Sequence, residues 1–262
     1  MLAGLAQRPK AAPSREYPTP AVREEQTVVV DGVREIWRLQ WMSGPKPACS
    51  PSDPESDTFP CLGFAYGDAG ALDLVRLRDG AEIDRLALAP LFEETPAEGA
   101  VVERWQPDLD KDFEVVATNN SVAFPQPREN LAPLVRKRPT VQVMHFGDYD
   151  HTGWKNEFYL QSGAAAGHTD GFVVGVSKRN RRLHALGTAS SPRKPLYLEH
   201  REWEALRDAS GPLEVVHWRC GDHGAENEST VRLGWTAGGI AGTRRVYTCP
   251  PDARKLIRED PL

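Results

Sequence analysis

Residues Thr27–Trp41, with the sequence TVVVDGVREIWRLQW, carry the pattern that decides the fold. The dipeptide Asp31-Gly32 separates two runs that are rich in β-branched and aromatic residues. An Asp-Gly pair between such runs is a strong hairpin signal, because a type I′ turn needs a positive φ at both central residues. Asp79-Gly80 repeats the arrangement between Leu72–Arg78 and Ala81–Leu88. We therefore predict two antiparallel hairpins in the first half of the chain.

Strands are also predicted for most of the remaining chain. The alternation of side chains at Thr140–Phe146 is typical of a half-buried strand. Further β-rich runs follow at Glu157–Gln161, Gly171–Ser177, Arg182–Gly187, Leu213–Arg219, Ser229–Trp235 and Thr243–Thr248. Two short helices are expected, at Glu129–Lys137 and at Leu198–Asp208, and the second should turn Trp203 and Leu206 inward.

The sequence thus predicts a mainly β fold with a minor α component. We expect antiparallel, sandwich-like sheets with hairpins and one or two short helices. No internal repeat is present, so a full propeller, which needs several similar blades, is not expected. Composition divides the chain into a flexible N-terminal arm at residues 1–25, a hairpin-rich region at 26–127, a second β-rich region at 128–250 and a polar tail at 251–262.

Length, charge and hydropathy exclude several classes of protein. A chain of 262 residues is long enough to bury a full core. The net charge of the chain is −5, whereas nucleic-acid-binding proteins carry a positively charged surface. No apolar run approaches the ~20 residues that span a bilayer. The beginning of the chain also lacks the apolar centre of a signal peptide.

The four cysteines favour an oxidising compartment. Cys49 and Cys61 bracket a loop rich in Pro, Ser and Asp, whereas Cys220 and Cys249 flank a predicted hairpin. Four cysteines permit three pairings, and we expect the two local disulfides, Cys49–Cys61 and Cys220–Cys249. Each would contribute about 3 kcal/mol by constraining the unfolded chain. The alternative is four reduced thiols in a cytosolic protein, and zinc is disfavoured because no C-x-x-C pair is present.

The candidate ligand site with the most specific spacing lies in Gly147–Gln161, GDYDHTGWKNEFYLQ. Asp148, Asp150 and Thr152 alternate, a glycine follows, and Asn156 stands eight positions after Asp148. Calcium takes oxygen ligands from carboxylates, hydroxyls, amides and carbonyls, and alternating side chains converge on one ion where the backbone curls. We therefore predict a Ca²⁺ site formed by Asp148, Asp150, Thr152, Asn156 and the carbonyl oxygen of Trp154.

This loop resembles the calcium loops of integrin-type propeller repeats, the FG-GAP or VCBS family, which read D-x-D-x-D-G-x-x-D before a strand. Thr152 and Asn156 stand where that pattern has carboxylates, so the resemblance implies weak binding, around 10⁻⁴ to 10⁻³ M. Glu157, just past the motif, is the nearest source of a third carboxylate. An EF-hand is disfavoured because Tyr159 occupies the twelfth position. The alternative for the segment is a tight turn capped by Asp side chains.

Two other segments have weaker patterns. Asp108, Asp110 and Asp112 alternate, but Phe113 stands where glycine is required, which favours a solvated acidic loop over a metal site. The basic run Lys178–Arg182, KRNRR, is compatible with binding of phosphate or a polyanion, although a solvated hairpin turn is the simpler interpretation.

The segment His217–His223 gathers metal-competent side chains, namely His217, Cys220, Asp222 and His223. His, Cys and Asp are zinc ligands, and an Asp–His pair can perform acid–base chemistry. Adjacent residues of a strand point to opposite faces, so Asp222 and His223 do not easily share one ion. The alternative is a strand end followed by a turn.

Together these patterns favour a non-catalytic, exported β-rich protein, periplasmic or extracellular, that acts as a binding or structural subunit with one weak calcium-type loop. A protein or glycan partner fits this class; nucleic acid and a membrane span do not. No phosphate-binding loop, dinucleotide fingerprint or hydrolase elbow is present. The alternative function is a metal-dependent hydrolase or carbohydrate-active enzyme that uses the His217–His223 cluster or carboxylates from several loops.

Overall fold

The computed structural model describes residues 21–48, 66–92, 100–105, 113–114, 117–118, 121–122, 126–127, 140–165, 168–249 and 254–262. Strands predominate in the described residues, which form three main antiparallel sheets and contain one α-helix. The predicted mainly β fold is therefore confirmed. The described sheets close into neither a barrel nor a propeller.

The first main sheet is built from the two predicted hairpins. In the order β1-β2-β5-β6 its strands are Ala21–Val30, Val33–Trp41, Leu72–Arg78 and Ala81–Ala87. Asp31 and Gly32 have φ values of 52° and 78°, and Asp79 and Gly80 have values of 51° and 80°. Positive φ at both central residues is the requirement of a type I′ turn, so both turn predictions are confirmed.

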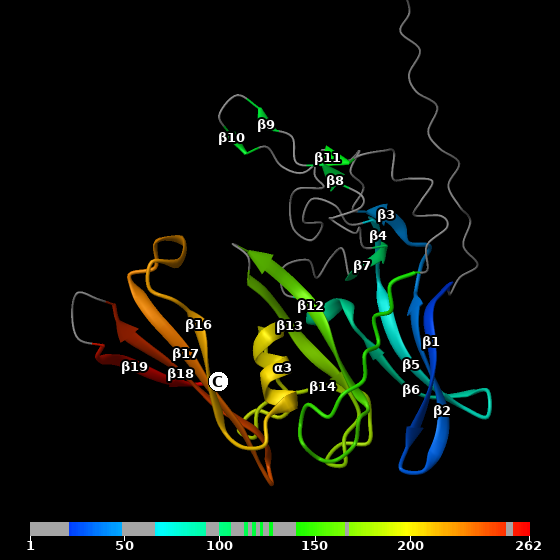
Figure 1. Cartoon of the computed structure of the whole chain (residues 1–262). Coiled ribbons are helices and arrows are strands. Elements are labelled where there is room, and N and C mark those ends of the chain that lie inside the picture. Colours follow the sequence, from blue (N-terminus) through cyan, green and yellow to red (C-terminus); the bar gives the residue numbers. More distant parts are fainter. Residues whose placement is uncertain are drawn as a thin grey trace, which may run out of the picture.

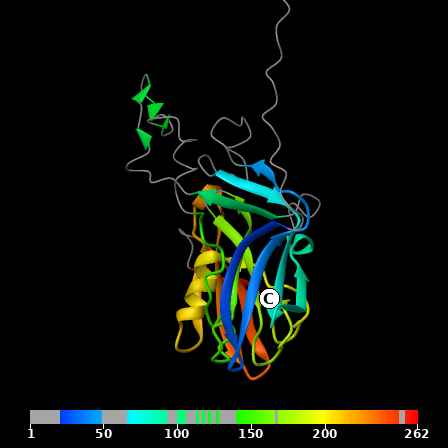
Figure 2. The same ribbon diagram turned by 90° about the vertical axis from the view of Figure 1, so that its right-hand side faces the viewer.

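Shorter strands form three smaller sheets at one end of the main sheets (Figures 1 and 2). One has the order β3-β4-β7, with strands Lys46–Ala48, Tyr66–Gly70 and Ala100–Trp105. The other two are the pairs β8 with β11, Phe113–Glu114 and Gln126–Pro127, and β9 with β10, Ala117–Thr118 and Ser121–Val122.

The second main sheet surrounds β13. Its strands are β12 (Glu157–Ala165), β13 (His168–Gly175), β14 (His184–Ala185) and β15 (Leu198–Glu199), and β13 pairs with the other three. Helix α3 (His200–Asp208) follows β15 directly and buries Trp203 and Leu206, as predicted.

The third main sheet has the order β16-β17-β18-β19, formed by Leu213–Trp218, Asn227–Thr236, Gly239–Thr248 and Leu256–Pro261. Its last strand, β19, lies in the segment that the sequence suggested only as a polar tail. Among the described residues β19 pairs only with β18, so it forms one edge of this sheet. Leu256 and Ile257 of β19 are exposed.

Two hydrophobic cores join the three main sheets. The first lies between the first and second sheets and includes Trp37, Leu72, Phe158, Phe172 and Val174. The second joins β13, α3 and the third sheet and includes Val173, Trp203, Leu206, Val231 and Leu233. Alternate residues of β13 thus enter different cores, because successive side chains of a strand point to opposite faces. Figure 1 shows the sheets side by side in chain order, with α3 between the second and the third.

The segment Thr140–Phe146 corrects the sequence prediction, because it is irregular and not a strand. Side chains of β1 bind its backbone instead of a strand partner. Glu24 accepts the N–H groups of Val143 (2.7 Å) and Met144 (3.1 Å), and Gln26 donates to the Met144 carbonyl. These bonds satisfy backbone groups of the segment without a β ladder.

The disulfide Cys220–Cys249 is present and joins the ends of β16 and β18, which confirms one of the two predicted pairings. Cys49 and Cys61, the helix predicted at Glu129–Lys137 and the acidic run Asp108–Asp112 lie outside the described residues. In the part of the chain that the structure describes, no helix has both the length and the apolar character needed to cross a membrane.

Candidate functional site

The segment between Gly147 and Glu157 is a closed loop. The N–H of Gly147 donates to the carbonyl of Glu157 over 2.7 Å, and the reverse bond measures 3.3 Å. Between these bonds the backbone has positive φ at His151 (55°) and at Gly153 (86°). The glycine that the sequence pattern required therefore stands where the backbone turns.

Asp148 and Asp150 cap this loop. Asp148 accepts the N–H of Thr152 through Oδ1 (2.9 Å) and the N–H of Gly153 through Oδ2 (2.8 Å). Oδ1 of Asp150 accepts a longer bond, 3.2 Å, from the same N–H of Thr152. These bonds match the Asp-capped turn that was the alternative for this segment. They also fix two carboxylates close to a third.

The third carboxylate belongs to Glu157, which is fully buried. Its Oε2 accepts the N–H groups of Tyr149 (2.7 Å) and Asp150 (3.3 Å), but its Oε1 has no hydrogen-bond partner among the described residues. Burial, and next the charge of Asp150, raise the pKa of the Glu157 carboxyl to about 10. One oxygen each from Asp148, Asp150 and Glu157 lie within 4.8 Å of one another. We call these three residues the carboxylate loop.

The remaining predicted ligands differ in their surroundings. The hydroxyl of Thr152 is buried and has no partner in the described part of the chain, so it is a candidate fourth oxygen ligand. Asn156 is buried, and its best hydrogen bonds direct the amide nitrogen to the carbonyls of Val29 (3.3 Å) and Lys155 (3.1 Å). Trp154 lines a surface pocket beside β1 together with Asn156. The side chain of Asn156 therefore bonds to β1 of the first sheet through the carbonyl of Val29.

The basic run Lys178–Arg182 is exposed, as a solvated turn should be, but it also forms ion pairs. Its three arginines each pair with a carboxylate: Arg179 with Asp150 (2.8 Å), Arg181 with Asp31 (2.6 Å) and Arg182 with Asp84 (3.1 Å). Through these pairs the run connects the carboxylate loop with the first sheet.

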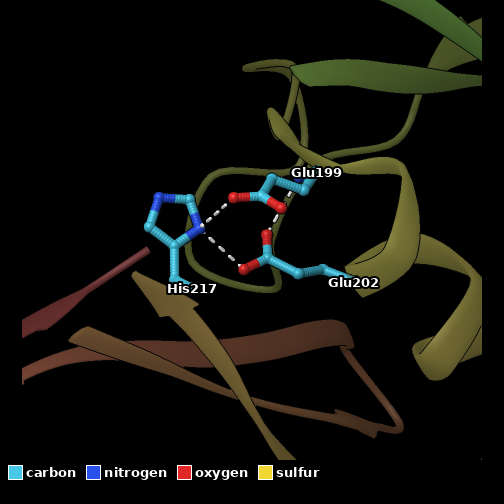
Figure 3. Close-up of side chains that lie close together, drawn as sticks. All are labelled: Glu199, Glu202 and His217. Atoms are coloured by element: carbon cyan, nitrogen blue, oxygen red, sulfur yellow. Dashed lines mark hydrogen bonds and ion pairs between the residues drawn. The ribbon is translucent and has the colours of Figure 1, made fainter. Parts of the chain in front are cut away.

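A second group of metal-competent side chains lies at the start of α3 (Figure 3). Glu199 and Glu202 are both buried, with 3% and 0% exposure, and occupy capping-box positions of the helix. Nδ1 of His217, on β16, lies 2.8 Å from Oε1 of Glu202 and 3.2 Å from Oε1 of Glu199. Each of the three residues can offer one ligand atom, and these atoms lie within 4.8 Å of one another.

His168, the first residue of β13, also faces this group. Its Nδ1 lies 2.7 Å from Oε1 of Glu199, and its ring packs at a tilt of 32° against Trp218 with a centroid distance of 3.8 Å. We call His168, Glu199, Glu202 and His217 the His–Glu cluster. The cluster brings together nitrogen and oxygen donors, whereas the carboxylate loop offers only oxygens.

The structure divides the residues that the sequence grouped at His217–His223. Cys220 is consumed by its disulfide and is no longer a metal ligand. His217 is largely buried against Glu202, whereas His223 is exposed and contacts Asp222 (Nδ1 to Oδ1, 2.8 Å). His217 therefore belongs to a site built from other segments, and the enzyme alternative based on this cluster stays a prediction.

Sequence reasoning missed His168, Glu199 and Glu202 as candidate ligands. The two glutamates are three positions apart at a predicted helix start, which is a local signal of a capping box. His168 stands 31 residues before Glu199, and only the pairing of β13 with β15 brings the two together. No spacing in the sequence reveals that contact.

Comparison with known proteins adds no functional assignment. No family model matches the chain, and neither the curated proteins nor the solved structures gave a significant match. The chemistry of the two groups of side chains is therefore the basis on which a function is proposed.

Proposed function

We propose that this chain is a non-catalytic, β-rich binding or structural protein of a periplasmic or extracellular compartment, and that its carboxylate loop holds one Ca²⁺ ion. The observation that carries the proposal is Glu157. A carboxylate that is fully buried and leaves one oxygen without a hydrogen bond is costly, unless a cation or a proton completes its surroundings.

The charge balance of the loop supports a divalent ion. Asp148, Asp150 and Glu157 bring three negative charges when ionised, and Arg179 supplies one positive charge through its pair with Asp150. A divalent cation would neutralise the remaining two. Buried charges are stable in proteins when they are paired or bind a metal in this way.

The donor atoms support calcium among divalent ions. The three carboxylates and the Thr152 hydroxyl offer oxygen alone, which suits a hard cation, and calcium accepts irregular geometry more readily than magnesium does. The resemblance to FG-GAP calcium loops points to the same ion. Glu157 supplies the carboxylate that the motif lacked, although affinity in the range of about 10⁻⁴ to 10⁻³ M remains our expectation.

The position of the loop supports an ordering role. The ring of His151 stacks on Trp235 of β17 at a centroid distance of 3.5 Å, and its Nε2 lies 2.6 Å from the Leu206 carbonyl. The ring of Tyr149 packs edge-on against Trp203. An ion that fixes the loop would therefore fix contacts with α3 and the third sheet. The Cys220–Cys249 disulfide supports a compartment outside the cytoplasm.

The proposal is tested by thermal unfolding of chelator-treated protein with and without millimolar CaCl₂. An ion that binds only the folded state raises the melting temperature by mass action. Glu157→Gln keeps the size of the side chain but removes its charge. We expect this variant to be at least as stable as the parent without calcium and to lose the calcium-induced rise.

The matched control is Glu226→Gln, which removes an exposed carboxylate near η2 (Asp222–Gly224) and should leave the calcium response intact. A parent protein whose melting curve does not move in millimolar calcium would show that the loop is an Asp-capped turn without an ion. A calcium response that survives in Glu157→Gln would place the ion elsewhere.

A further inference from the structure

The His–Glu cluster has features of a metal site of a different kind from the carboxylate loop. Donor atoms of His217, Glu199 and Glu202 converge there within 4.8 Å of one another, and Nδ1 of His168 lies 2.7 Å from Oε1 of Glu199 beside this group. We infer that His217, Glu199 and Glu202 form a site for a divalent transition-metal ion of the zinc class, with His168 as an outer partner of Glu199, distinct from the proposed calcium site.

The distances fit such an ion after a small expansion. Nδ1 of His217 lies 2.8 Å from Oε1 of Glu202 and 3.2 Å from Oε1 of Glu199. In a tetrahedral zinc site, with metal–ligand bonds of about 2.0–2.1 Å, neighbouring donor atoms lie about 3.3 Å apart. The two separations at His217 are therefore shorter than in a metal complex by about 0.5 and 0.1 Å.

Proton counting provides an independent observation. Carboxylates accept hydrogen bonds, and each Nδ1 carries at most one hydrogen. His217 Nδ1 nevertheless lies within 3.2 Å of oxygens from two carboxylates, and Oε1 of Glu199 faces two imidazole nitrogens. Two hydrogens thus serve three contacts. A single cation between His217, Glu199 and Glu202 would satisfy these three donors at once, and His168 would keep its hydrogen bond to Glu199.

The other atoms of these ligands are held in place by further partners. Oε2 of Glu199 pairs with Nε of Arg201 (2.6 Å), and Oε2 of Glu202 accepts the N–H of Glu199 (2.9 Å). His168 lies between Glu199 and Asp222, with Nδ1 2.7 Å from Oε1 of Glu199 and Nε2 3.5 Å from Oδ2 of Asp222. Outer partners of this kind orient the side chains that bind a metal.

The donor set decides the class of ion. Imidazole nitrogen suits zinc and neighbouring transition metals, whereas calcium and magnesium prefer oxygen alone. The ligands come from the β15–α3 junction and from β16, so a bound ion would connect the second sheet, the helix and the third sheet. Both imidazole side chains are slightly exposed, 12% and 11%, which leaves the ion a route of entry.

The inference is tested with chelator-treated full-length protein. Zn²⁺ binding is measured by isothermal titration calorimetry, and Co²⁺ is used as a spectroscopic probe because a four-coordinate site gives it strong visible absorption. We expect one equivalent of each ion to bind and Zn²⁺ to displace Co²⁺. Millimolar Ca²⁺ should leave the cobalt spectrum unchanged.

Variants assign the ligands. His217→Gln and Glu202→Gln should weaken zinc binding by more than the about 10–100-fold expected for His168→Gln, which removes only an outer partner of Glu199. His184→Gln is the matched control, since His184 lies on β14 and contacts the Arg182 carbonyl. Asp148→Asn should leave zinc binding unchanged, which separates this site from the carboxylate loop.

Far-UV circular dichroism checks that each variant is folded. If His217→Gln does not fold, Glu202→Gln replaces it as the test of the ligands, because glutamine is close in size to glutamate. Absence of zinc binding by the parent, or a weak octahedral cobalt spectrum, would overturn the inference. The same holds if zinc binding is equal in the parent, His217→Gln and Glu202→Gln.

Discussion

The carboxylate loop and the His–Glu cluster satisfy their buried charges in opposite ways. In the loop, the ligands lie within ten residues of one another, and a buried oxygen of Glu157 lacks a partner among the described residues. In the cluster, the side chains come from segments up to 49 residues apart, and each carboxylate faces an imidazole or a guanidinium. Local spacing thus identified a group with an unpaired buried oxygen, whereas tertiary packing built a group whose carboxylates are paired.

The largest expected effect comes from removing the imidazole that serves both glutamates. In metal-free protein, His217→Phe should lower the free energy of unfolding by about 3–5 kcal/mol, because it leaves two buried carboxylates without that partner. Glu157→Gln should cost little by the same urea titration, because the raised pKa of Glu157 leaves this side chain neutral in calcium-free protein and glutamine is neutral and similar in size. If Glu157→Gln proves the more destabilising of the two, the contrast between the groups is wrong.

An intermediate effect is expected at Arg179, the counter-charge of the carboxylate loop. Arg179→Gln should destabilise the calcium-free protein by about 1–2 kcal/mol, an estimate reduced for the partial exposure of this arginine. It should also enlarge the calcium-induced rise in melting temperature, because a competing positive charge is gone.

The control for that change is Arg181→Gln, which breaks an exposed pair with Asp31 and should cost about 0–1 kcal/mol. A calcium response that shrinks in Arg179→Gln would indicate that the arginine positions Asp150 for the ion and does not compete with it.

The smallest effect should come from a turn far from both groups. Gly80 has a φ of 80°, so Gly80→Val places a β-branched residue in the left-handed region and should cost about 1 kcal/mol. Neither the calcium nor the zinc response should change. Gly211→Ala, at an open position without a positive φ, is the matched control. A valine variant as stable as the parent would contradict the turn assignment.

Features encoded by neighbouring residues could be predicted from the sequence. Asp31-Gly32 and Asp79-Gly80 set both hairpins, because the turn geometry depends on the two residues themselves. The start of α3 and its buried Trp203 followed from helical spacing. The same locality allowed Asp148 and Asp150 to be named before the structure was known.

Features that depend on distant partners could not be predicted. Thr140–Phe146 alternates like a strand, yet Glu24, more than a hundred residues earlier, binds its backbone in place of a neighbouring strand. His168 meets Glu199 only because β13 pairs with β15. The role of Glu157 depended on burial, which sequence spacing does not show.

The outer strand β19 has a consequence for self-association. An unpaired strand edge that carries exposed apolar residues, such as Leu256 and Ile257, can serve as a template for another chain. Here Arg258, Glu259 and Asp260 follow them, and Pro261 ends the strand. Consecutive charges and a proline are the means by which natural sheets resist edge-to-edge aggregation. The protein therefore protects this border of its third sheet from fibril-like growth by its own sequence.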